Sequence, residues 1–363
     1  MLVRIGEVGG YMQNTLDAVV IGGGQAGLAS GYYLQKAGLN FMILEAGNQP
    51  TGSWPQYYDS LKLFSPARYS SLPGYPFPKA PNEYPLRDEV ITYLRQYAEK
   101  FKLPVKVNQK VEHIEVGNGG FDVITIAGDR FRTKTLISAS GSFHRPHLPS
   151  LPGADSFQGR ILHSSDYKHP ESFLGKRVVV VGRGNSSVQI AVELANHSNV
   201  SLAVQQPVRF TPQRILGLDL HFWLKITGID AFPFYRIGKE PPSPISVFDL
   251  GGYRKKIDNG NPDQRTMFSA FSPEGVVWAN GEREPVDIVI FATGYRPHLP
   301  FLSGTGALAS DSRPLHVAGV STEVPGLYYV GLSNQRSFAS ATVRGVGPDA
   351  KYVVQNIKRF LKR

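Results

Sequence analysis

Two glycine-rich turns in the chain have residue types and spacing suited to holding the pyrophosphate of a dinucleotide. The first is Gly22-x-Gly24-x-x-Gly27, which follows the short β-branched run DAVVI and leads into a stretch of helical character. Gly22 permits the tight turn, Gly24 lets the backbone approach the pyrophosphate, and Gly27 lets the helix pack closely on the strand. The free N–H groups and the positive dipole at the amino end of that helix then face the phosphates.

An acidic residue follows the first turn at the expected distance. Glu45 closes a second buried run, FMIL, 18 residues after Gly27, and there a carboxylate can accept both hydroxyls of an adenosine ribose. Strand, glycine turn, helix, strand and acid in this order make a βαβ unit. We therefore predict a dinucleotide site that also uses Gln25 and Ala26 of the turn.

The second turn is Gly182-x-Gly184-x-x-Ser187, directly after the run RVVVV. Ser187 takes the place of the third glycine, and its small side chain loosens the match at the packing position without forbidding it. The βαβ pattern thus partly repeats within the chain. Two dinucleotide sites in one chain are typical of enzymes that pair FAD with a nicotinamide cofactor.

The elements around the two turns predict an α/β protein with two dinucleotide-binding, Rossmann-like domains. The FAD-binding domain is interrupted by a smaller NAD(P)H-binding domain: we assign 12–165 and 289–363 to the first, and 166–288 to the second. Other expected elements are an ordered loop at 50–85, a helix at 87–101, an antiparallel meander at 105–137, a helix at 218–226 and a last helix at 347–362. The rest of 207–265 has no pattern that predicts a pocket.

Composition and charge exclude several classes of function. The 363 residues include no cysteine, which removes disulfide frameworks, thiolate metal sites and electron relay through a cysteine pair, and we expect no metal. No apolar run of about 18 residues occurs, so we expect no membrane span and a cytoplasmic protein. The net charge of +10 comes from scattered Lys and Arg residues, which disfavours nucleic acid as a partner.

A third motif lies just ahead of the second glycine turn. The segment FQGRILHSSDY places Phe157, Gly159, His163 and Tyr167 at the spacing F-x-G-x-x-x-H-x-x-x-Y. With this motif between two glycine turns, the chain resembles the flavin-containing monooxygenases, which are class B flavoprotein monooxygenases, and their bacterial CzcO-like relatives. The resemblance covers nearly all of 17–363. It implies that His163 packs the domain junction more than it acts as an acid or base.

Three further segments agree with this resemblance. Ala292–Gly294 resembles the ATG segment that returns the chain to the FAD domain, and Ala139–Gly141 resembles its partner in the other linker. Gly52–Trp54 resembles the G-x-W that places an indole beside the flavin. The related Baeyer–Villiger enzymes have W-P after the histidine motif, whereas this chain has Tyr167–His169, which disfavours them.

The chain departs from the family at the expected 2′-phosphate contact. NADPH-specific members carry an arginine after the second strand of the nicotinamide domain, and this chain has Gln205 and Gln206 there. Losing one charge-assisted contact costs about 1.5–3 kcal/mol, or roughly one to two decades of affinity. We therefore predict that NADH is accepted, with NADPH still open because Arg209 or Arg214 could reach the phosphate.

A second departure concerns Phe64, in the segment SLKLFSP. By resemblance, family enzymes place an asparagine near this position, where it donates a hydrogen bond that helps hold the cofactor and the oxygenated flavin. Phenylalanine cannot donate, so we expect more leakage of hydrogen peroxide. The alternative is that the alignment to the family is shifted by one residue and that Phe64 is a core residue.

The resemblance implies an FAD-dependent NAD(P)H:O2 monooxygenase. NADPH or NADH would reduce the flavin, and a C4a-hydroperoxyflavin would give one oxygen atom to a thioether or amine, a soft S or N nucleophile in a small molecule. A homodimer is a common form of such folds. The predicted catalytic positions are Phe64 and His163. The predicted cofactor contacts are Gly22, Gly24, Gln25, Ala26, Gly27, Glu45, Trp54, Val111, Gly182, Gly184, Asn185, Ser186, Ser187, Gln205, Gln206 and, at the flavin edge, Gln335.

Three other functions compete with this one. A flavin disulfide reductase would share both glycine turns, but the absence of cysteine removes it. An NAD(P)H oxidase or flavin reductase that makes H2O2 without oxygenation is the main alternative, and Phe64 favours it. Some chains that resemble this one carry labels connected with cation transport, so a regulatory dinucleotide-binding module also fits the fold.

Overall fold

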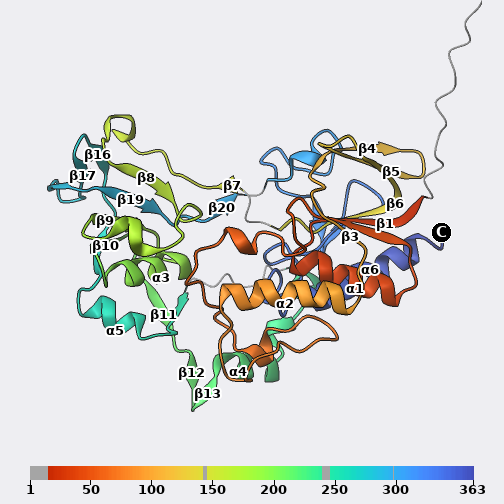
Figure 1. Cartoon of the computed structure of the whole chain (residues 1–363), viewed down its shortest axis with the longest axis horizontal. Helices are drawn as coiled ribbons and strands as arrows, with labels where there is room; N and C mark the ends of the chain where they lie inside the picture. The colour runs from red at the N-terminus through yellow and green to blue at the C-terminus, as the bar shows by residue number, and fades with distance from the viewer. Residues whose placement is uncertain (1–14, 142–144, 239–245, 297) are drawn as a thin grey trace, which may run out of the picture.

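The computed structural model describes residues 15–141, 145–238, 246–296 and 298–363. Two sheets, each with helices packed on it, lie side by side and are joined by a narrower middle (Figure 1). The first glycine turn follows a strand of one sheet and the second turn follows a strand of the other. The predicted fold class is thereby confirmed. Residues 12–14 of the predicted first domain and 239–245 of the predicted insert lie outside the described residues.

Strand β1 lies in the interior of the first sheet, and the strands beside β1 are parallel to it. The order is β21-β22-β23-β6-β1-β2-β3, with β4 and β5 continuing from β6 as a meander. The last four residues of β1 are buried, as expected for a parallel strand covered on both faces. The strands are β1 (Leu16–Ile21), β2 (Phe41–Leu44), β3 (Val105–Lys106), β4 (Val111–Gly117), β5 (Gly120–Thr125), β6 (Arg130–Ser138), β21 (His316–Val317), β22 (Val320–Ser321) and β23 (Leu327–Tyr329).

The prediction of an antiparallel meander over 105–137 is correct only for part of that range. Strands β4, β5 and β6 pair antiparallel, but β3 pairs parallel with β2, and β6 also pairs parallel with β1 and β23. The second half of β6 is buried because it is an interior strand of the parallel sheet. Alternating side chains alone could not reveal that one strand serves both arrangements.

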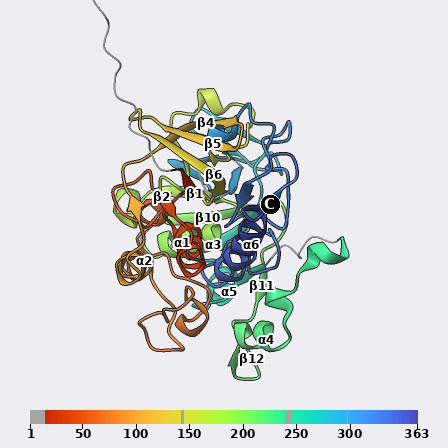
Figure 2. The same ribbon diagram turned by 90° about the vertical axis from the view of Figure 1, so that its right-hand side faces the viewer.

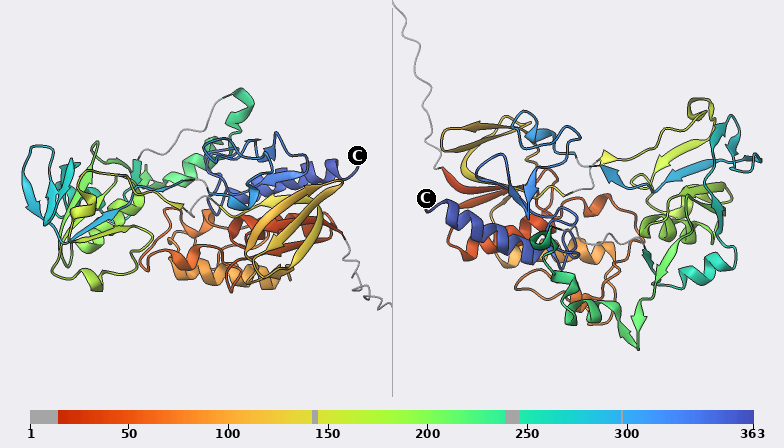
Figure 3. Two further views of the ribbon diagram at one scale, coloured as in Figure 1. Left: turned by 90° about the horizontal axis from the view of Figure 1, so that it is seen from above. Right: turned by 180° about the vertical axis from the view of Figure 1, so that it is seen from behind.

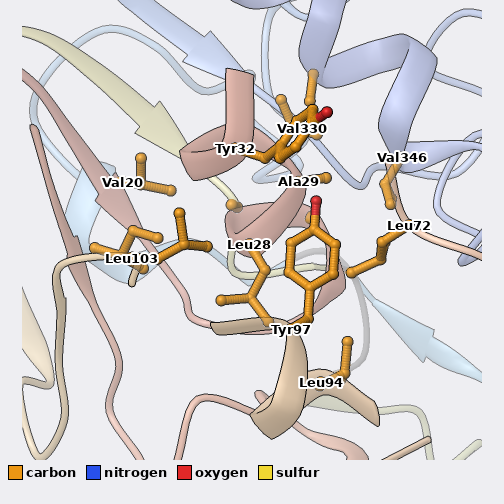
Figure 4. Packing of buried hydrophobic residues seen from close by; sticks show 14 of the residues in the cluster. Val20, Leu28, Ala29, Tyr32, Leu72, Leu94, Tyr97, Leu103, Val330 and Val346 are labelled. Atoms are coloured by element: carbon orange, nitrogen blue, oxygen red, sulfur yellow. The ribbon is translucent and has the colours of Figure 1, made fainter. Parts of the chain in front are cut away.

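Three helices cover one face of the first sheet: α1 (Gln25–Lys36), α2 (Arg87–Lys100) and α6 (Val346–Phe360). Helix α1 packs against α6 on one side and α2 on the other. Figure 4 shows Leu28 and Tyr32 of α1 beside Tyr97 of α2 and Val346 of α6. Leu28 and Tyr97 are fully buried, so the helix that carries the first glycine turn is held firmly on its sheet.

The second sheet is entirely parallel, in the order β15-β10-β9-β19-β8. Its strands are β8 (Arg160–His163), β9 (Arg177–Val181), β10 (Asn199–Val204), β15 (Asp263–Thr266) and β19 (Ile288–Phe291). Helices α3 (Asn185–Leu194) and α5 (Tyr253–Asp258) pack with this sheet. The predicted boundary at 165/166 assigns β8 to the first domain, but β8 lies in the second sheet. The predicted boundary at 288/289 falls within β19.

The remaining strands form small sheets. Antiparallel β7 (Arg145–Pro146) and β20 (Tyr295–Arg296) join the two linkers between the domains. The others are β11 (Arg209–Thr211) with β14 (Ser246–Phe248), β12 (Arg214–Ile215) with β13 (Leu218–Asp219), and β16 (Ala270–Ser272) with β17 (Gly275–Val277) and β18 (Arg283–Pro285). The short 3-10 helices are η1 (Trp54–Gln56), η2 (Ala67–Tyr69), η3 (Ala154–Ser156), η4 (Pro170–Phe173), η5 (Ile229–Ala231), η6 (Phe234–Ile237) and η7 (Pro300–Leu302).

A segment of the second domain leaves its own sheet and contacts the first domain. This segment, residues 214–238, is called the strap here, and it contains α4 (Leu220–Ile226), close to the helix predicted at 218–226. Figure 2 shows it in green at the lower edge of the molecule, and Figure 3, from behind, shows it below the first domain. Asp230 of the strap pairs with Arg344, and its carbonyl accepts from the N–H of Ala339.

No helix in the described ranges combines the length and the apolar character needed to cross a membrane.

Candidate functional site

The first glycine turn is tight enough to require glycine. Gly22 has φ +106°, and a Cβ there would lie 2.6 Å from the carbonyl oxygen of Ala139. A Cβ on Gly27 would lie 1.8 Å from the carbonyl oxygen of Gly22. Helix α1 begins after the extended Gly24 with no side-chain cap. Its first N–H groups are therefore available to an anion such as a pyrophosphate.

Glu45 folds onto the turn that it was predicted to serve. Its side chain is 5% exposed; Oε2 accepts from the N–H of Gly23 at 2.6 Å, and Oε1 accepts from the N–H of Gly47 at 2.7 Å. Each carboxylate oxygen keeps a second lone pair, so ribose hydroxyls can still be accepted. Val111 begins β4 close to this point, since the N–H of Gln109 donates to the Glu45 carbonyl at 2.8 Å.

Trp54 and Gln25 meet through one hydrogen-bonded chain. The Trp54 indole Nε1 donates to Gln25 Oε1 at 2.6 Å, and Gln25 Nε2 donates to the carbonyl of Ala341 at 2.8 Å. Ala341 has φ +70°, an uncommon conformation for a residue other than glycine. Such backbone strain tends to occur at functional sites. In this conformation the carbonyl of Ala341 faces Gln25 of the first turn.

Gln335 is held by backbone at both ends of its amide. It is 3% exposed, its Nε2 donates to the carbonyl of Tyr329 at 2.8 Å, and its Oε1 accepts from the N–H of Leu332 at 3.3 Å. Both ends of the amide are thus engaged with backbone after β23. The structure places Gln335 as a brace for this strand end.

The amino end of α6 carries a buried acid. Asp349 is fully buried, its Oδ1 lies 3.1 Å from Nη1 of Arg336, and burial raises the pKa of its carboxyl. Gly345 precedes the helix, and a Cβ there would lie 1.8 Å from the Ala339 carbonyl oxygen. The positive end of the α6 dipole therefore lies beside the segment that contacts Gln25 through Ala341.

The second glycine turn tolerates its serine. Gly182 has φ +136°, and a Cβ there would lie 2.6 Å from the carbonyl oxygen of Ala292. Ser187 is fully buried, and its Oγ donates to the carbonyl of Gly184 at 2.8 Å. The hydroxyl is satisfied within the first turn of α3, so the turn keeps its shape. Gly184 is extended and α3 has no side-chain cap at its start.

Asn185 and Ser186 connect this turn to other segments. Asn185 Oδ1 accepts from the backbone N–H of Phe248 at 3.1 Å. Ser186 lies beside the hydroxyl of Tyr58, whose pKa is raised by burial. That hydroxyl donates to Gln189 Oε1 at 2.6 Å, which links the 50–85 loop of the first domain directly to α3 of the second.

Arg183 is a candidate residue that the sequence motifs did not indicate. It stands inside the second turn, and its Nη1 donates to Gln206 Oε1 at 2.7 Å. Gln205 and Gln206 are exposed, so a guanidinium lies beside the place where the family arginine was expected. Only its position between Gly182 and Gly184 could have pointed to it, because the turn motif leaves that residue type free.

The other two arginines considered for this role lie in different surroundings. Arg209 lines a cavity of about 400 Å³ that begins at Pro207, directly after Gln206, and also contains Arg254. Arg214 lies on the strap and lines a separate cavity with residues of the 50–85 loop. The structure therefore brings Arg183 and Arg209 to the Gln206 end of β10, and it gives Arg214 a different environment.

His163 has both ring nitrogens occupied. The side chain is 1% exposed; Nδ1 accepts from the N–H of Ser165 at 3.1 Å, and Nε2 lies 3.0 Å from the carbonyl of Gly294. The tautomer that satisfies both contacts carries its proton on Nε2. Burial lowers the pKa of His163, which favours the neutral ring. The imidazole thus joins β8 to the ATG segment at the domain junction.

Phe64 lies in an aromatic cluster between the two domains. Its ring is parallel to that of Phe248, with centroids 4.8 Å apart, and it also stacks near His221 at 6.2 Å. Its carbonyl accepts from Gln213 Nε2 at 3.2 Å. Since Phe248 also donates to Asn185, Phe64 lies two contacts from the second glycine turn.

The chain is similar to known flavoproteins over nearly its whole length. Residues 19–223 match the model of the pyridine nucleotide-disulphide oxidoreductase family. An uncharacterized CzcO-like oxidoreductase of Geobacillus kaustophilus is 35% identical, over 95% of this chain and 99% of that protein. Indole-3-pyruvate monooxygenase YUCCA4 of Oryza sativa subsp. japonica is 30% identical, over 95% and 88%.

A solved structure shares the fold closely. The flavin-containing monooxygenase from Stenotrophomonas maltophilia superposes with a TM-score of 0.84 at 31% identity, and the match covers 96% of this chain and 99% of that one.

Proposed function

The chain belongs to the pyridine nucleotide-disulphide oxidoreductase family, and on that premise we propose that it transfers one oxygen atom of O2 to a soft sulfur or nitrogen nucleophile of a small molecule. It is a flavin-dependent oxidoreductase of the flavin monooxygenase type. The thiol–disulfide chemistry in the family's name is closed to it, because the sequence contains no cysteine. We place this reaction in the cytoplasm.

Two dinucleotides fit the two turns. FAD fits the first turn, where α1 has an uncapped amino end and Glu45 retains lone pairs for the ribose. NADPH or NADH fits the second, where Gly182 leaves no room for a side chain. We propose an FAD domain at 12–165 and 289–363 and a nicotinamide domain at 166–288, with β8 and β19 at the edges of the latter.

The protein's own residues position and enclose the cofactors. Bound FAD would supply the redox chemistry, by accepting hydride and activating O2. The Trp54–Gln25–Ala341 chain fixes the indole beside the first turn, and the α6 dipole favours negative charge near its amino end. His163 is a positioning residue in this proposal, because both of its nitrogens hold the junction together.

The observation that carries the proposal is the direct hydrogen bond between Tyr58 of the FAD side and Gln189 of α3. Tyr58 is 5% exposed, so this contact is part of a packed junction. This contact holds the domain of α1 against the domain of α3, and each of these helices begins with an uncapped glycine turn. Transfer of hydride between two dinucleotides requires their two sites to be held together in this way.

The alternative function is an NAD(P)H oxidase or flavin reductase that releases H2O2. Phe64 favours it, because its ring packs on Phe248 and offers no donor to a bound ligand. The ring of Phe64 is half-buried, which also agrees with a packing role for this residue.

The test uses the purified, flavin-loaded protein with a simple thioether, NADH and labelled O2. Oxygenation predicts one labelled sulfoxide for each NADH consumed, less the fraction lost as peroxide. The oxidase alternative predicts peroxide equal to the NADH consumed with no labelled product. A protein that purifies colourless and binds no added FAD would contradict both.

A further inference from the structure

A cavity of about 170 Å³ lies where the 50–85 loop of the first domain meets the strap. It shares no residue with either glycine turn. Its walls come from two parts of the chain that are far apart in sequence. They are Pro66, Arg68, Tyr69, Asn82 and Tyr84 on one side, and Arg214, Gly217, Leu218, Asp219 and Phe222 on the other.

The two arginines of this cavity have no counter-ion within the described ranges. Arg68 and Arg214 are both exposed, and neither takes part in an ion pair there. Arg68 comes from the first domain and Arg214 comes from the strap. Asp219 is the one acidic residue among the lining residues.

Asp219 forms no ion pair with either arginine in the described ranges, and its carboxylate is held by other donors. Oδ2 accepts from the Tyr84 hydroxyl at 2.5 Å and from Gln213 Nε2 at 2.7 Å. Oδ1 accepts from the N–H of His221 at 2.8 Å and lies 2.8 Å from its Nδ1. Arg214 lies directly opposite Asp219 in the β12–β13 hairpin, yet no ion pair joins them.

The state of Asp219 supports this interpretation. Burial alone would raise the pKa of its carboxyl, but the hydrogen bonds from His221, Tyr84 and Gln213 outweigh it and lower the pKa to about 2. The ionised carboxylate holds Tyr84 of the first domain against the strap and keeps its negative charge. With two arginines and one aspartate, the lining residues still carry a net positive charge.

Further cations and two rings complete the surroundings. Lys225 lies 5.8 Å from the ring centre of Tyr69, and Lys62 lies 5.9 Å from that of Tyr84. Tyr69 and Phe222 give the cavity aromatic walls. The cations would attract an anion, and the aromatic walls offer apolar contact to a flat ligand.

We propose that this cavity binds the carboxylate of a small aromatic or otherwise planar acid, with Arg68 and Arg214 pairing to the carboxylate from opposite sides. The guanidinium fork matches the two oxygens of a carboxylate. A bound carboxylate also joins the domains, because it reduces the repulsion between two like charges that come from different parts of the chain. This inference does not rest on the oxygenation proposed above, since it concerns binding alone.

The test is calorimetric titration of the flavin-loaded protein with benzoate, its neutral analogue benzamide, and inorganic phosphate. We expect benzoate to bind to the native protein and benzamide to bind at least about tenfold more weakly, which is one charge-assisted contact. Equal affinity for benzoate and benzamide would overturn the proposal, as would no benzoate binding. Binding of phosphate in preference to benzoate would show that the anion class is wrong.

Variants locate the binding site. Arg68→Gln and Arg214→Gln should each weaken benzoate at least about tenfold, and Arg68→Lys should weaken it less because the charge remains. Arg95→Gln, an exposed change on α2, should leave benzoate affinity unchanged. If the two cavity variants bind benzoate as the native protein does while remaining folded by circular dichroism, the site is elsewhere and the proposal fails.

Discussion

Asp230 of the strap and Arg344 of the C-terminal segment form a two-point ion pair. Arg344 Nε lies 2.8 Å from Oδ2 of Asp230, and Arg344 Nη2 lies 2.8 Å from Oδ1. Their side chains are only 17% and 10% exposed, respectively. This geometry is the strongest form of the arginine–carboxylate contact, and it ties the inserted domain to the segment that leads into α6.

We expect Asp230→Ala to destabilise the protein by about 1–3 kcal/mol, because the largely buried guanidinium of Arg344 loses its partner. The midpoint of urea unfolding measures this. Asp311→Ala removes an exposed ion pair with Arg313 and should cost much less, because solvent screens such a pair. Equal effects of the two changes would mean that the strap is not held by this pair.

Gly27→Ala should weaken FAD binding. Its Cβ would lie 1.8 Å from the carbonyl oxygen of Gly22, so the turn must open. We expect the Kd for FAD to rise at least about tenfold, measured as flavin absorbance per protein after gel filtration. Gly251→Ala is the control, since a Cβ there meets no atom closer than 3.5 Å. Full flavin content in Gly27→Ala would refute the assignment of FAD to this turn.

Arg183→Ala should weaken NADPH more than NADH. The guanidinium beside Gln206 is placed to pair with a 2′-phosphate, and its loss costs about 1.5–3 kcal/mol, or roughly 10- to 100-fold in Kd. NADH, which lacks the phosphate, should change little. Titrations of tryptophan fluorescence with each nucleotide compare the two, and a parallel loss for both would show that Arg183 shapes the turn instead. Gln206→Arg should strengthen NADPH binding.

The stability of the protein should fall as the pH drops below about 6.5, the ordinary pKa of histidine. Burial lowers the pKa of His163 and of His316 in the folded protein, so in this window the unfolded chain binds more protons and acid favours unfolding. Each histidine contributes at most about 1.4 kcal/mol per pH unit. In urea unfolding at several pH values, His163→Gln should show a shallower decline than the native protein.

Phe64→Asn should reduce peroxide leakage if Phe64 lies beside the reacting ligand. The new amide can donate where the ring cannot, at the cost of the stacking on Phe248. The ratio of H2O2 formed to NADH consumed measures the change. An unaltered ratio together with lower stability would identify Phe64 as a packing residue, which is the alternative that its aromatic surroundings also support.

Short-range patterns made much of the fold predictable. Residues Gly22 to Gly27, the acid at Glu45 and the repeat at Gly182 lie within single βαβ units, where neighbouring residues decide the backbone path. The parallel pairing of the strands within those units followed from the pattern, as did the helices at the turns. Short-range patterns could not predict the pairing of β6, which is parallel to β1 and antiparallel to β5.

The site was predictable in part. The turn residues, Glu45 and Trp54 come together as expected, because each lies in or next to an element that the pattern identifies. Gln335 was assigned to the flavin edge by its place after a strand, and this assignment stays a prediction; the structure shows its amide hydrogen-bonded to backbone at both ends. Side-chain direction after a strand end depends on neighbours that the local sequence does not name.

From the amino-acid order alone one obtains two dinucleotide turns, a two-domain α/β fold and the exclusion of cysteine chemistry, because each depends on backbone needs of a few adjacent residues or on composition. The strap, the Tyr84–Asp219 contact and the arginine-lined cavity depend on folding. Their partners are separated by more than 100 residues and follow no period, so only packing of one domain against the other brings them together.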